Sequence, residues 1–372
     1  MSRTFTRGFR TWSGFGAAGL ALVASAPALG GSPSRQATEL AVDTNWADNT
    51  LSIINLKSHS ELNRIEVGPK PYDVKADRLG RFVYASLSGG NEISVVDLQA
   101  NLEAYRITVG ESPRDFVFTP DFSRLVVANS GSNSISVVDV RNKKELFQIQ
   151  VGLVPYGVGL AAGGRLVIVS NWGEGTVSFV DLEAKKEISR IPVGHLPYTV
   201  AVSPAKDVAY TAAFGDDKVI ALDLRTHSVL REIPVGKSPW GLSVDSSGSH
   251  VAVANFYSGS ISVIKVDDPR AADGFSVETY ELRGAKPGDH ITASPTARKP
   301  TDGVQTAMIG GVERAKHVDI ADNGTVLFTD LAANTVNTLD LNTGTLVESV
   351  PVGHAPYGID FLPQEVRKSA MR

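Results

Sequence analysis

The chain has 372 residues, of which 42% are hydrophobic and 20% are charged, and this is the composition of an ordinary globular protein. It contains no cysteine, which excludes a disulfide scaffold and any metal site built on thiolates. The formal net charge is −4. Because polyanions are bound mainly through Lys and Arg, a mildly acidic chain is a poor candidate for nucleic-acid binding.

The first 28 residues have the pattern of a secretory signal peptide. Three arginines and no acidic residue precede an apolar run that begins at Gly14, and small residues follow around Ala26. The run is shorter than the roughly 20 residues of a membrane span. We therefore expect cleavage within residues 26–28, a linker over residues 29–37, and a periplasmic or secreted mature protein without a membrane span. An uncleaved membrane anchor is the alternative.

A 42-residue repeat occupies the rest of the chain. The sequence Val-Gly-x-x-Pro recurs without a slip in the first five copies and returns near the C-terminus, and a degenerate copy over residues 311–315 fills the gap. The regular copies begin at Val67, Val109, Val151, Val193, Val235 and Val352. A fixed period of this length indicates a repeat architecture with seven units.

Each period has the pattern of four short strands. In the copy over residues 151–193, the β-branched runs are 156–160, 166–169, 176–180 and 187–191. Strands separated by polar turns every 8–12 residues are typical of antiparallel blades. Helical periodicity, which a solenoid of this period would need, is nearly absent. The sequence predicts an all-β fold, a seven-bladed β-propeller of four-stranded antiparallel blades over residues 38–364, followed by a tail over 365–372.

The two ends of the repeat region complement each other. The region begins with the second strand type, at residues 39–42, and ends with the first type, at residues 357–361. An open array would leave an incomplete blade and exposed strand edges. We expect the C-terminal strand to pair with the N-terminal blade and close the ring.

The second strands carry a further signature, in residues 126–129, 167–171 and 251–255. Each of these runs ends in Asn and is followed by a Ser-Val-Val-Asp-like strand and a Val-Gly-x-x-Pro loop. The pattern resembles the YVTN-repeat β-propeller family, which includes exported YncE-like proteins, and the resemblance extends over residues 38–364. It implies the propeller fold. It says little about function, because these propellers serve as binding modules, surface proteins and relatives of lactonases.

One column of the repeat has a structural explanation. An aspartate ends the third strand in five copies, where its side chain can cap a turn by accepting backbone N–H groups. These residues are Asp97, Asp139, Asp181, Asp223 and Asp340. We assign them to turns and not to chemistry.

A second column predicts a binding site. The residue after each loop proline is aromatic in five copies and cationic in two, and the resemblance implies that this position varies among repeats. These residues are Tyr72, Arg114, Tyr156, Tyr198, Trp240, Lys316 and Tyr357. Because inner strands surround the axis of a propeller, we expect the seven side chains to meet at one opening. Aromatic residues are typical of binding surfaces, although packing that plugs the opening is an alternative role.

The loops between the second and third strands are expected on the same face. They hold Trp46, Ser88, Ser130, Trp172, Phe214, Phe256 and Leu331. We include Trp46 and Trp172 in the predicted ligand-binding set. The interval from Trp240 to Lys316 exceeds the period by 34 residues. The insertion, about 285–314, is predicted to form a functional loop on this face.

The sequence therefore favours an exported, non-catalytic propeller that binds a small molecule or an extracytoplasmic protein. The aromatic residues would stack against a planar or sugar-like group, and Arg114 and Lys316 would hold an anionic group. No cofactor is expected.

Two alternatives remain open. The first is a lactonase-like hydrolase or lyase with a metal ion in the channel, for which Asp73, Asp115 and His317 are weak candidate ligands. The second is binding of single-stranded nucleic acid by stacking on the aromatic residues, which the acidic net charge disfavours.

Overall fold

The computed structural model describes residues 39–282, 284–291, 294–295 and 314–363. All of them belong to one compact unit, Ser32–Arg372. The predicted signal peptide, the linker, most of the insertion and the tail lie outside the described residues. Among the described residues, no helix is long and apolar enough to cross a membrane.

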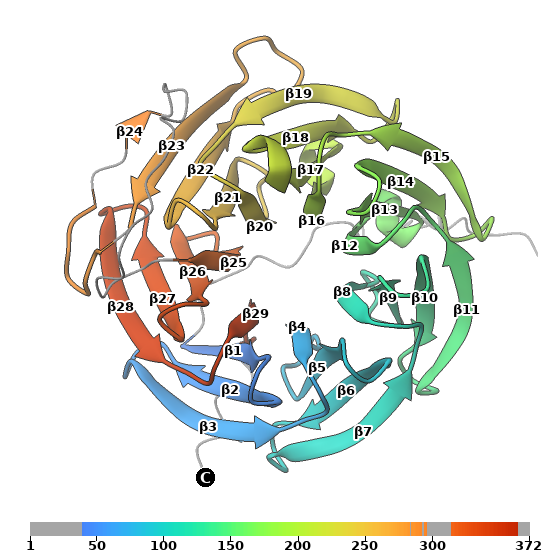
Figure 1. Cartoon of the computed structure of the whole chain (residues 1–372), viewed down its shortest axis with the longest axis horizontal. Coiled ribbons are helices and arrows are strands. Elements are labelled where there is room, and N and C mark those ends of the chain that lie inside the picture. Colours follow the sequence, from blue (N-terminus) through green and yellow to red (C-terminus); the bar gives the residue numbers. More distant parts are fainter. Residues whose placement is uncertain (1–38, 283, 292–293, 296–313, 364–372) are drawn as a thin grey trace, which may run out of the picture. The chain divides into compact units, whose positions relative to one another are not determined.

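The described strands form seven antiparallel sheets arranged as a ring (Figure 1). From the axis outward, the first sheet contains β29 (Pro356–Phe361), β1 (Leu40–Asn45), β2 (Thr50–Asn55) and β3 (Ser60–Glu66). The second and third contain β4 (Pro71–Ala76), β5 (Phe82–Leu87), β6 (Glu92–Asp97) and β7 (Leu102–Thr108), then β8 (Pro113–Phe118), β9 (Arg124–Asn129), β10 (Ser134–Asp139) and β11 (Lys144–Gln150). The fourth and fifth contain β12 (Pro155–Ala161), β13 (Leu166–Asn171), β14 (Thr176–Asp181) and β15 (Lys186–Pro192), then β16 (Pro197–Ser203), β17 (Val208–Ala213), β18 (Lys218–Asp223) and β19 (Ser228–Pro234).

The sixth sheet contains β20 (Pro239–Val244), β21 (His250–Asn255), β22 (Ser260–Val266), β23 (Phe275–Glu281) and a short fifth strand, β24 (Ser294–Pro295). The seventh contains β25 (Ala315–Ile320), β26 (Thr325–Asp330), β27 (Thr335–Asp340) and β28 (Thr345–Pro351). Three single-turn 3₁₀ helices, η1 (Ala162–Gly164), η2 (Pro204–Lys206) and η3 (Phe214–Asp216), lie in loops. The prediction of seven four-stranded blades is confirmed.

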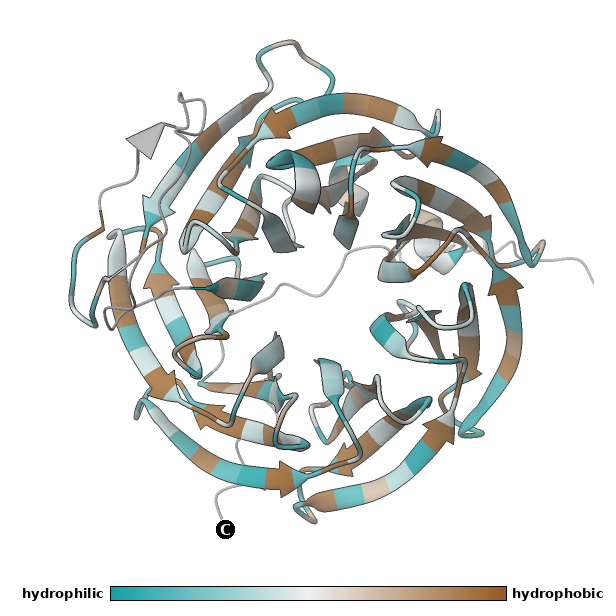
Figure 2. Cartoon of the chain, in the orientation of Figure 1, coloured by the Kyte–Doolittle hydropathy of each residue, from teal (hydrophilic) through white to brown (hydrophobic). Residues whose placement is uncertain are grey.

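The hydrophobic core lies between neighbouring sheets. One cluster, for example, joins Val126 and Val137 of the third sheet to Val167 and Val169 of the fourth. The middle strands are buried on both sides, and β13 has no exposed residue. The outer strands alternate between exposed and half-buried residues, as β11 does, so hydrophilic and hydrophobic bands alternate along the rim (Figure 2). Each sheet therefore depends on both of its neighbours for burial.

The ring closes as the sequence predicts. Strand β29 pairs antiparallel with β1, with Ala41 opposite Phe361, and the N–H of Leu362 donates to the carbonyl of Leu40 at 3.0 Å. The innermost strand of the first sheet therefore comes from the C-terminus, and β1 has a partner on each side.

The aspartate column has the predicted turn role. The Oδ1 atom of Asp97 accepts the N–H groups of Gln99 and Ala100 at 2.9 and 3.1 Å, and the other four aspartates accept equivalent bonds. The glycine of Val-Gly-x-x-Pro is explained by close approach: a Cβ atom on Gly110 would lie 2.5 Å from Nδ2 of Asn129.

Two sets of loops define the two faces of the ring. The loops after the second strands bond to the loops before the first strands, and the N–H of Trp172, for example, donates to the carbonyl of Val154 at 3.0 Å. The two predicted columns therefore share one face. On the opposite face, the turns after the first and third strands bond to each other, as between Leu98 N–H and the Arg81 carbonyl.

The insertion is described only in part. Its described part runs along β28 of the next sheet, where the N–H of Gly288 donates to Leu346 at 2.8 Å and His290 forms a bridge with Thr345. Because β28 begins at a turn of the opposite face, residues 284–291 reach that face along the rim. Residues 294–295 then pair with β23 as β24. The expectation that the insertion emerges on the face of the aromatic column stays a prediction, because residues 296–313 lie outside the described part.

Candidate functional site

The seven residues of the aromatic and cationic column meet as one closed ring of contacts. Each is the second residue of an inner strand. We call the set the mouth ring; its members are Tyr72, Arg114, Tyr156, Tyr198, Trp240, Lys316 and Tyr357. The Arg114 guanidinium lies 4.8 Å from the Tyr72 ring and 4.9 Å from the Tyr156 ring. The next contact is between Tyr156 and Tyr198, whose ring centroids are 4.8 Å apart.

The remaining contacts complete the circle. The centroids of Tyr198 and Trp240 are 4.1 Å apart, and the Lys316 amine lies 4.2 Å from the Trp240 ring. The same amine contacts the ring of Tyr357, whose centroid is 5.2 Å from that of Tyr72. Side chains from all seven sheets thus converge, as the 42-residue register requires. Their predicted role as ligand contacts stays a prediction.

Five residues of the second column contact the mouth ring: Trp46, Ser130, Trp172, Phe214 and Phe256. Trp46 stacks on Tyr357 with centroids 5.8 Å apart and planes 20° apart, and Trp172 lies 5.8 Å from Tyr156. Phe214 and Phe256 contact Trp240 in the same way. Opposite Arg114 the column has a serine, Ser130, whose hydroxyl accepts the Nε–H of Arg114 at 3.1 Å. These contacts fix the orientation of the mouth ring.

Burial divides the mouth ring into two groups. Tyr72, Tyr198 and Lys316 are buried, with 3%, 8% and 0% of their surface exposed. The other four members, Arg114, Tyr156, Trp240 and Tyr357, are half-buried, as are Trp46 and Trp172. A ligand would therefore contact the half-buried group, with the buried Lys316 amine beneath it.

The electrostatics of the mouth ring favour a ligand that carries a hydrogen-bond acceptor or a negative charge. Burial raises the pKa of the Tyr72 and Tyr357 hydroxyls, so both stay neutral. Burial and the charge of Arg114 hold the pKa of the Lys316 amine well below its usual range. Within the described part of the chain, the Lys316 amine and the indole N–H groups of Trp46, Trp172 and Trp240 are buried without a hydrogen-bond partner. Four donors thus lack an acceptor, which is costly in a buried position.

Beneath the mouth ring lies a layer of ionisable residues. The Lys75 amine is 2.8 Å from Oδ2 of Asp73 and 3.6 Å from Oδ1 of Asp115. Burial raises the pKa of Asp115, and the negative charge of Asp73 adds to this effect. For Asp73 burial acts in the same direction, but the charges of Lys75 and His317 outweigh it and lower the pKa. One carboxyl of the pair therefore holds its proton more strongly than the other.

The weak metal candidates are only partly brought together. Asp73 and Asp115 meet, but Lys75 lies between them, and burial lowers the pKa of His317 to about 4. Among residues 39–282, 284–291, 294–295 and 314–363, no group of three His, Cys, Asp or Glu side chains could hold a metal ion. The residues described do not fit a three-ligand metal centre.

Sequence reasoning missed the role of Lys75 and of Asp360, whose Oδ2 accepts the N–H of Ala76 at 2.9 Å from the neighbouring sheet. The signal was available, because both residues stand two places after the Asp73 column. Alternate residues of a strand face the same side, so the second polar column should have been read together with the first.

Two models of known propeller families match parts of the chain. The model of the YNCE-like β-propeller family matches residues 76–250, and the model of lactonases with a seven-bladed β-propeller matches residues 186–358. No curated protein sequence matches the chain.

Solved structures show the same fold at low sequence identity. Hydrazine synthase of Kuenenia stuttgartiensis has a TM-score of 0.60 and 17% identity over 77% of this chain and 88% of its own. A functionally unknown protein of Desulfotomaculum acetoxidans DSM 771 has a TM-score of 0.68 and 14% identity over 87% and 98%. The β-propeller domain of Cps50 (Swd1) from Myceliophteria thermophila has a TM-score of 0.60 and 16% identity over 79% and 90%.

These structures support the fold alone. The repeat, the ring of seven sheets and the two family models agree with one another. Together they support a seven-bladed β-propeller similar to the YncE-like family.

Proposed function

We propose that the chain is an exported binding protein that holds a small planar organic anion against the mouth ring. The observation that carries the proposal is the set of four buried donors without an acceptor, one of which is the Lys316 amine against the Trp240 ring, together with the Arg114 guanidinium stacked on Tyr72 and Tyr156. The export part rests on the signal-like pattern of residues 1–28. The alternative ligand of the mouth ring is a protein partner that presents a carboxylate.

The chemistry of the ring selects the ligand class. A flat ring would stack on the half-buried Tyr156, Trp240 and Tyr357, and a carboxylate or phosphate would attract Arg114 and Lys316. Arg114 and Lys316 form no ion pair among the described residues, whereas Asp73 and Asp115 pair with Lys75. The Arg114 charge and the Lys316 amine are therefore available to a ligand.

Anion binding can be tested by the change in melting temperature with benzoate, benzyl alcohol and benzylamine. Benzoate is expected to raise the melting temperature, because a ligand that binds only the folded state stabilises it. The neutral and cationic compounds, which share its ring, should have a smaller effect. Equal responses to all three would contradict the proposed anion site.

The Lys316→Met substitution gives a sharper test. Methionine has a similar volume and removes a buried amine that has no hydrogen-bond partner, so the unliganded protein should melt at the same or a higher temperature. The response to benzoate should be lost. Lys75→Met is the matched control, because it leaves two buried carboxyls without their cation and should lower stability. A Lys316→Met variant that still responds to benzoate would refute the assignment.

The Trp240→Ala substitution separates binding from plugging. If the ring binds a ligand, the variant should lose benzoate affinity and remain folded. If the ring only packs the opening, the variant should lose about 3–5 kcal/mol of stability, as truncation of a large buried aromatic does, while any benzoate response persists.

A lactonase-like hydrolase is the second candidate, and the lactonase model match over residues 186–358 favours it. It would need a metal ion bound near Asp73, Asp115 and His317. Elemental analysis and the effect of calcium or zinc on the melting temperature test it directly. Single-stranded nucleic acid is the least favoured ligand; salt-dependent binding of an oligonucleotide would support it.

A further inference from the structure

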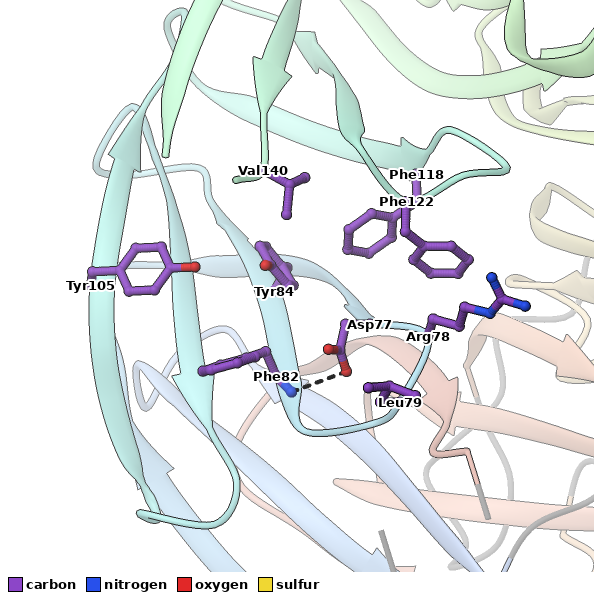
Figure 3. Close-up of a pocket in the computed structure, with 9 residues that line it drawn as sticks. All are labelled: Asp77, Arg78, Leu79, Phe82, Tyr84, Tyr105, Phe118, Phe122 and Val140. Carbon is purple, nitrogen blue, oxygen red and sulfur yellow. Dashed lines mark hydrogen bonds between the residues drawn. The ribbon is translucent and has the colours of Figure 1, made fainter. Parts of the chain in front are cut away.

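A second concentration of aromatic residues lies on the face opposite the mouth ring. A pocket of about 730 Å³ opens at the seam between the second and third sheets. Figure 3 shows its lining: Asp77, Arg78, Leu79, Phe82, Tyr84, Tyr105, Phe118, Phe122 and Val140. Tyr84 is 3% exposed and forms the floor, whereas Leu79 is 58% exposed and lies at the rim. The size is that of a typical small-molecule site.

Phe122 adopts a backbone conformation that its residue type disfavours. It sits in the turn after β8 with φ of 57°, and its N–H donates to the carbonyl of Thr119 at 2.8 Å. In three other sheets the same turn, with the same bond, has glycine: Gly80, Gly248 and Gly324. Glycine is at ease with positive φ, while a bulky residue there is an outlier. The repeat thus provides an internal comparison in which only this turn carries an aromatic ring.

The strained position places the Phe122 ring against the pocket. Its centroid is 5.0 Å from that of Phe118, with planes 32° apart, and Phe118 is 5.1 Å from Tyr84 in an edge-on contact. Phe82 and Tyr105 complete the walls (Figure 3). Residues held in strained conformations often belong to functional sites.

The fold itself does not require this lining. The equivalent seam between the sixth and seventh sheets has a pocket of about 210 Å³. There Asp245 takes the place of Asp77, but His250, Ile320 and Gly324 replace Phe82, Phe118 and Phe122. That seam has a single Phe, Tyr or Trp residue in its lining, Tyr280, so the cluster of five aromatic residues is an addition to the architecture.

We propose that this pocket is a binding site for a small aromatic molecule, separate from the mouth ring. Flat faces on several sides suit a planar ring. At the rim the Asp77 carboxyl accepts the N–H of Phe82 at 3.1 Å, and burial raises its pKa. Its oxygens can also accept a bond from an N–H or O–H group of the ligand.

Indole is a suitable probe, because it is a planar ring with one N–H donor. Titration calorimetry should detect binding to the wild-type protein. Phe122→Gly installs the residue that three equivalent turns already have, so the variant should fold and melt at the same or a higher temperature. Its affinity for indole should fall at least tenfold. Unchanged affinity, or no binding of indole to the wild type, would overturn the proposal.

Further variants separate this site from the mouth ring. Phe118→Leu introduces the residue found at the equivalent Leu160 and should also weaken indole binding. Tyr257→Ala removes an exposed aromatic on the other face and should leave it unchanged, as should Lys316→Met. Indole binding that is lost in Lys316→Met but kept in Phe122→Gly would assign the probe to the mouth ring and refute the pocket.

Discussion

His317 belongs to the layer of ionisable residues beneath the mouth ring. It follows Lys316 on β25, and its ring centroid lies 6.5 Å from that of Tyr72. Burial lowers its pKa from 6.5 to about 4, against the opposing charge of Asp73, and the charges of Lys75 and Lys316 add to the lowering. The neutral imidazole is therefore the form that the folded protein accommodates.

This shift predicts a loss of stability in acid. Between pH 6.5 and about 4 the unfolded chain binds a proton on His317 that the folded chain does not, so stability falls as the pH is lowered through this window. A shift of this size corresponds to about 3 kcal/mol, and partial exposure of the ring reduces it to about 2 kcal/mol. Urea unfolding of the wild type and of His317→Gln, at pH 7.5 and pH 4.5, measures the effect. The variant should lose about 2 kcal/mol less on acidification, and identical losses would contradict the assignment.

The residues of the mouth ring could be predicted from the sequence because a strict period places them at equivalent points of one circle. The ionisation states beneath them could not. They depend on distances between side chains of neighbouring sheets, such as the 3.6 Å between the Lys75 amine and Oδ1 of Asp115, which no single repeat contains. The positive φ of Phe122 was not predicted from the sequence either, although its alignment with Gly80 and Gly248 in the repeat indicates such a conformation.

At the scale of the strand, an asparagine ends the second strand of four sheets. Its side-chain amide donates hydrogen bonds to two hydroxyl groups of the third strand of the same sheet. The amide of Asn171 donates to Thr176 at 3.0 Å and to Ser178 at 2.7 Å. Asn45, Asn129 and Asn255 make the same pair of bonds. In the fifth sheet Ala213 takes this position, opposite Lys218 and without either hydroxyl. The amide and the hydroxyl pair therefore occur together.

Replacing the asparagine by alanine in the fourth sheet, or the alanine by asparagine in the fifth, should destabilise the sheet that is changed. Asn171→Ala removes two buried hydrogen bonds, but the amide oxygen has no partner among the described residues. We therefore expect a net cost of about 1 kcal/mol. Ala213→Asn buries an amide beside Lys218 and Ile220 and should cost about 1–3 kcal/mol. Urea unfolding at neutral pH measures both, and an Asn171→Ala variant as stable as the wild type would show that the bonds contribute nothing.

The course of the insertion could not be predicted from the repeat. The period fixes where β23 ends and where β25 begins, but it carries no information about a segment without a counterpart in other blades. Backbone bonds of Gly288 and Ile291 to β28 direct the described part along the rim. The long turn before β23 was missed for the same reason; Arg270 in this turn bonds to Asp223 of the preceding sheet.

For the whole molecule, closure of the ring and assembly of the mouth ring are one event. Strand β29 completes the first sheet and also supplies Tyr357, which links Lys316 to Tyr72. The same strand carries Asp360, which accepts a bond from the second sheet. The last residues of the propeller to be synthesised thus join its first and last sheets, and the candidate site is incomplete until they do.

Removal of residues 356–372 should therefore abolish both the stability and the candidate site. Ile359, Phe361 and Leu362 are buried, and burial of three such side chains contributes roughly 5–8 kcal/mol. The truncated chain should also expose the edge of β1 and aggregate. Removal of residues 364–372 alone, which leaves β29 complete, is the control and should not change the melting temperature. Thermal unfolding and gel filtration distinguish these outcomes. A monomeric, cooperatively melting chain without β29 would show that the seven sheets do not need their closing strand.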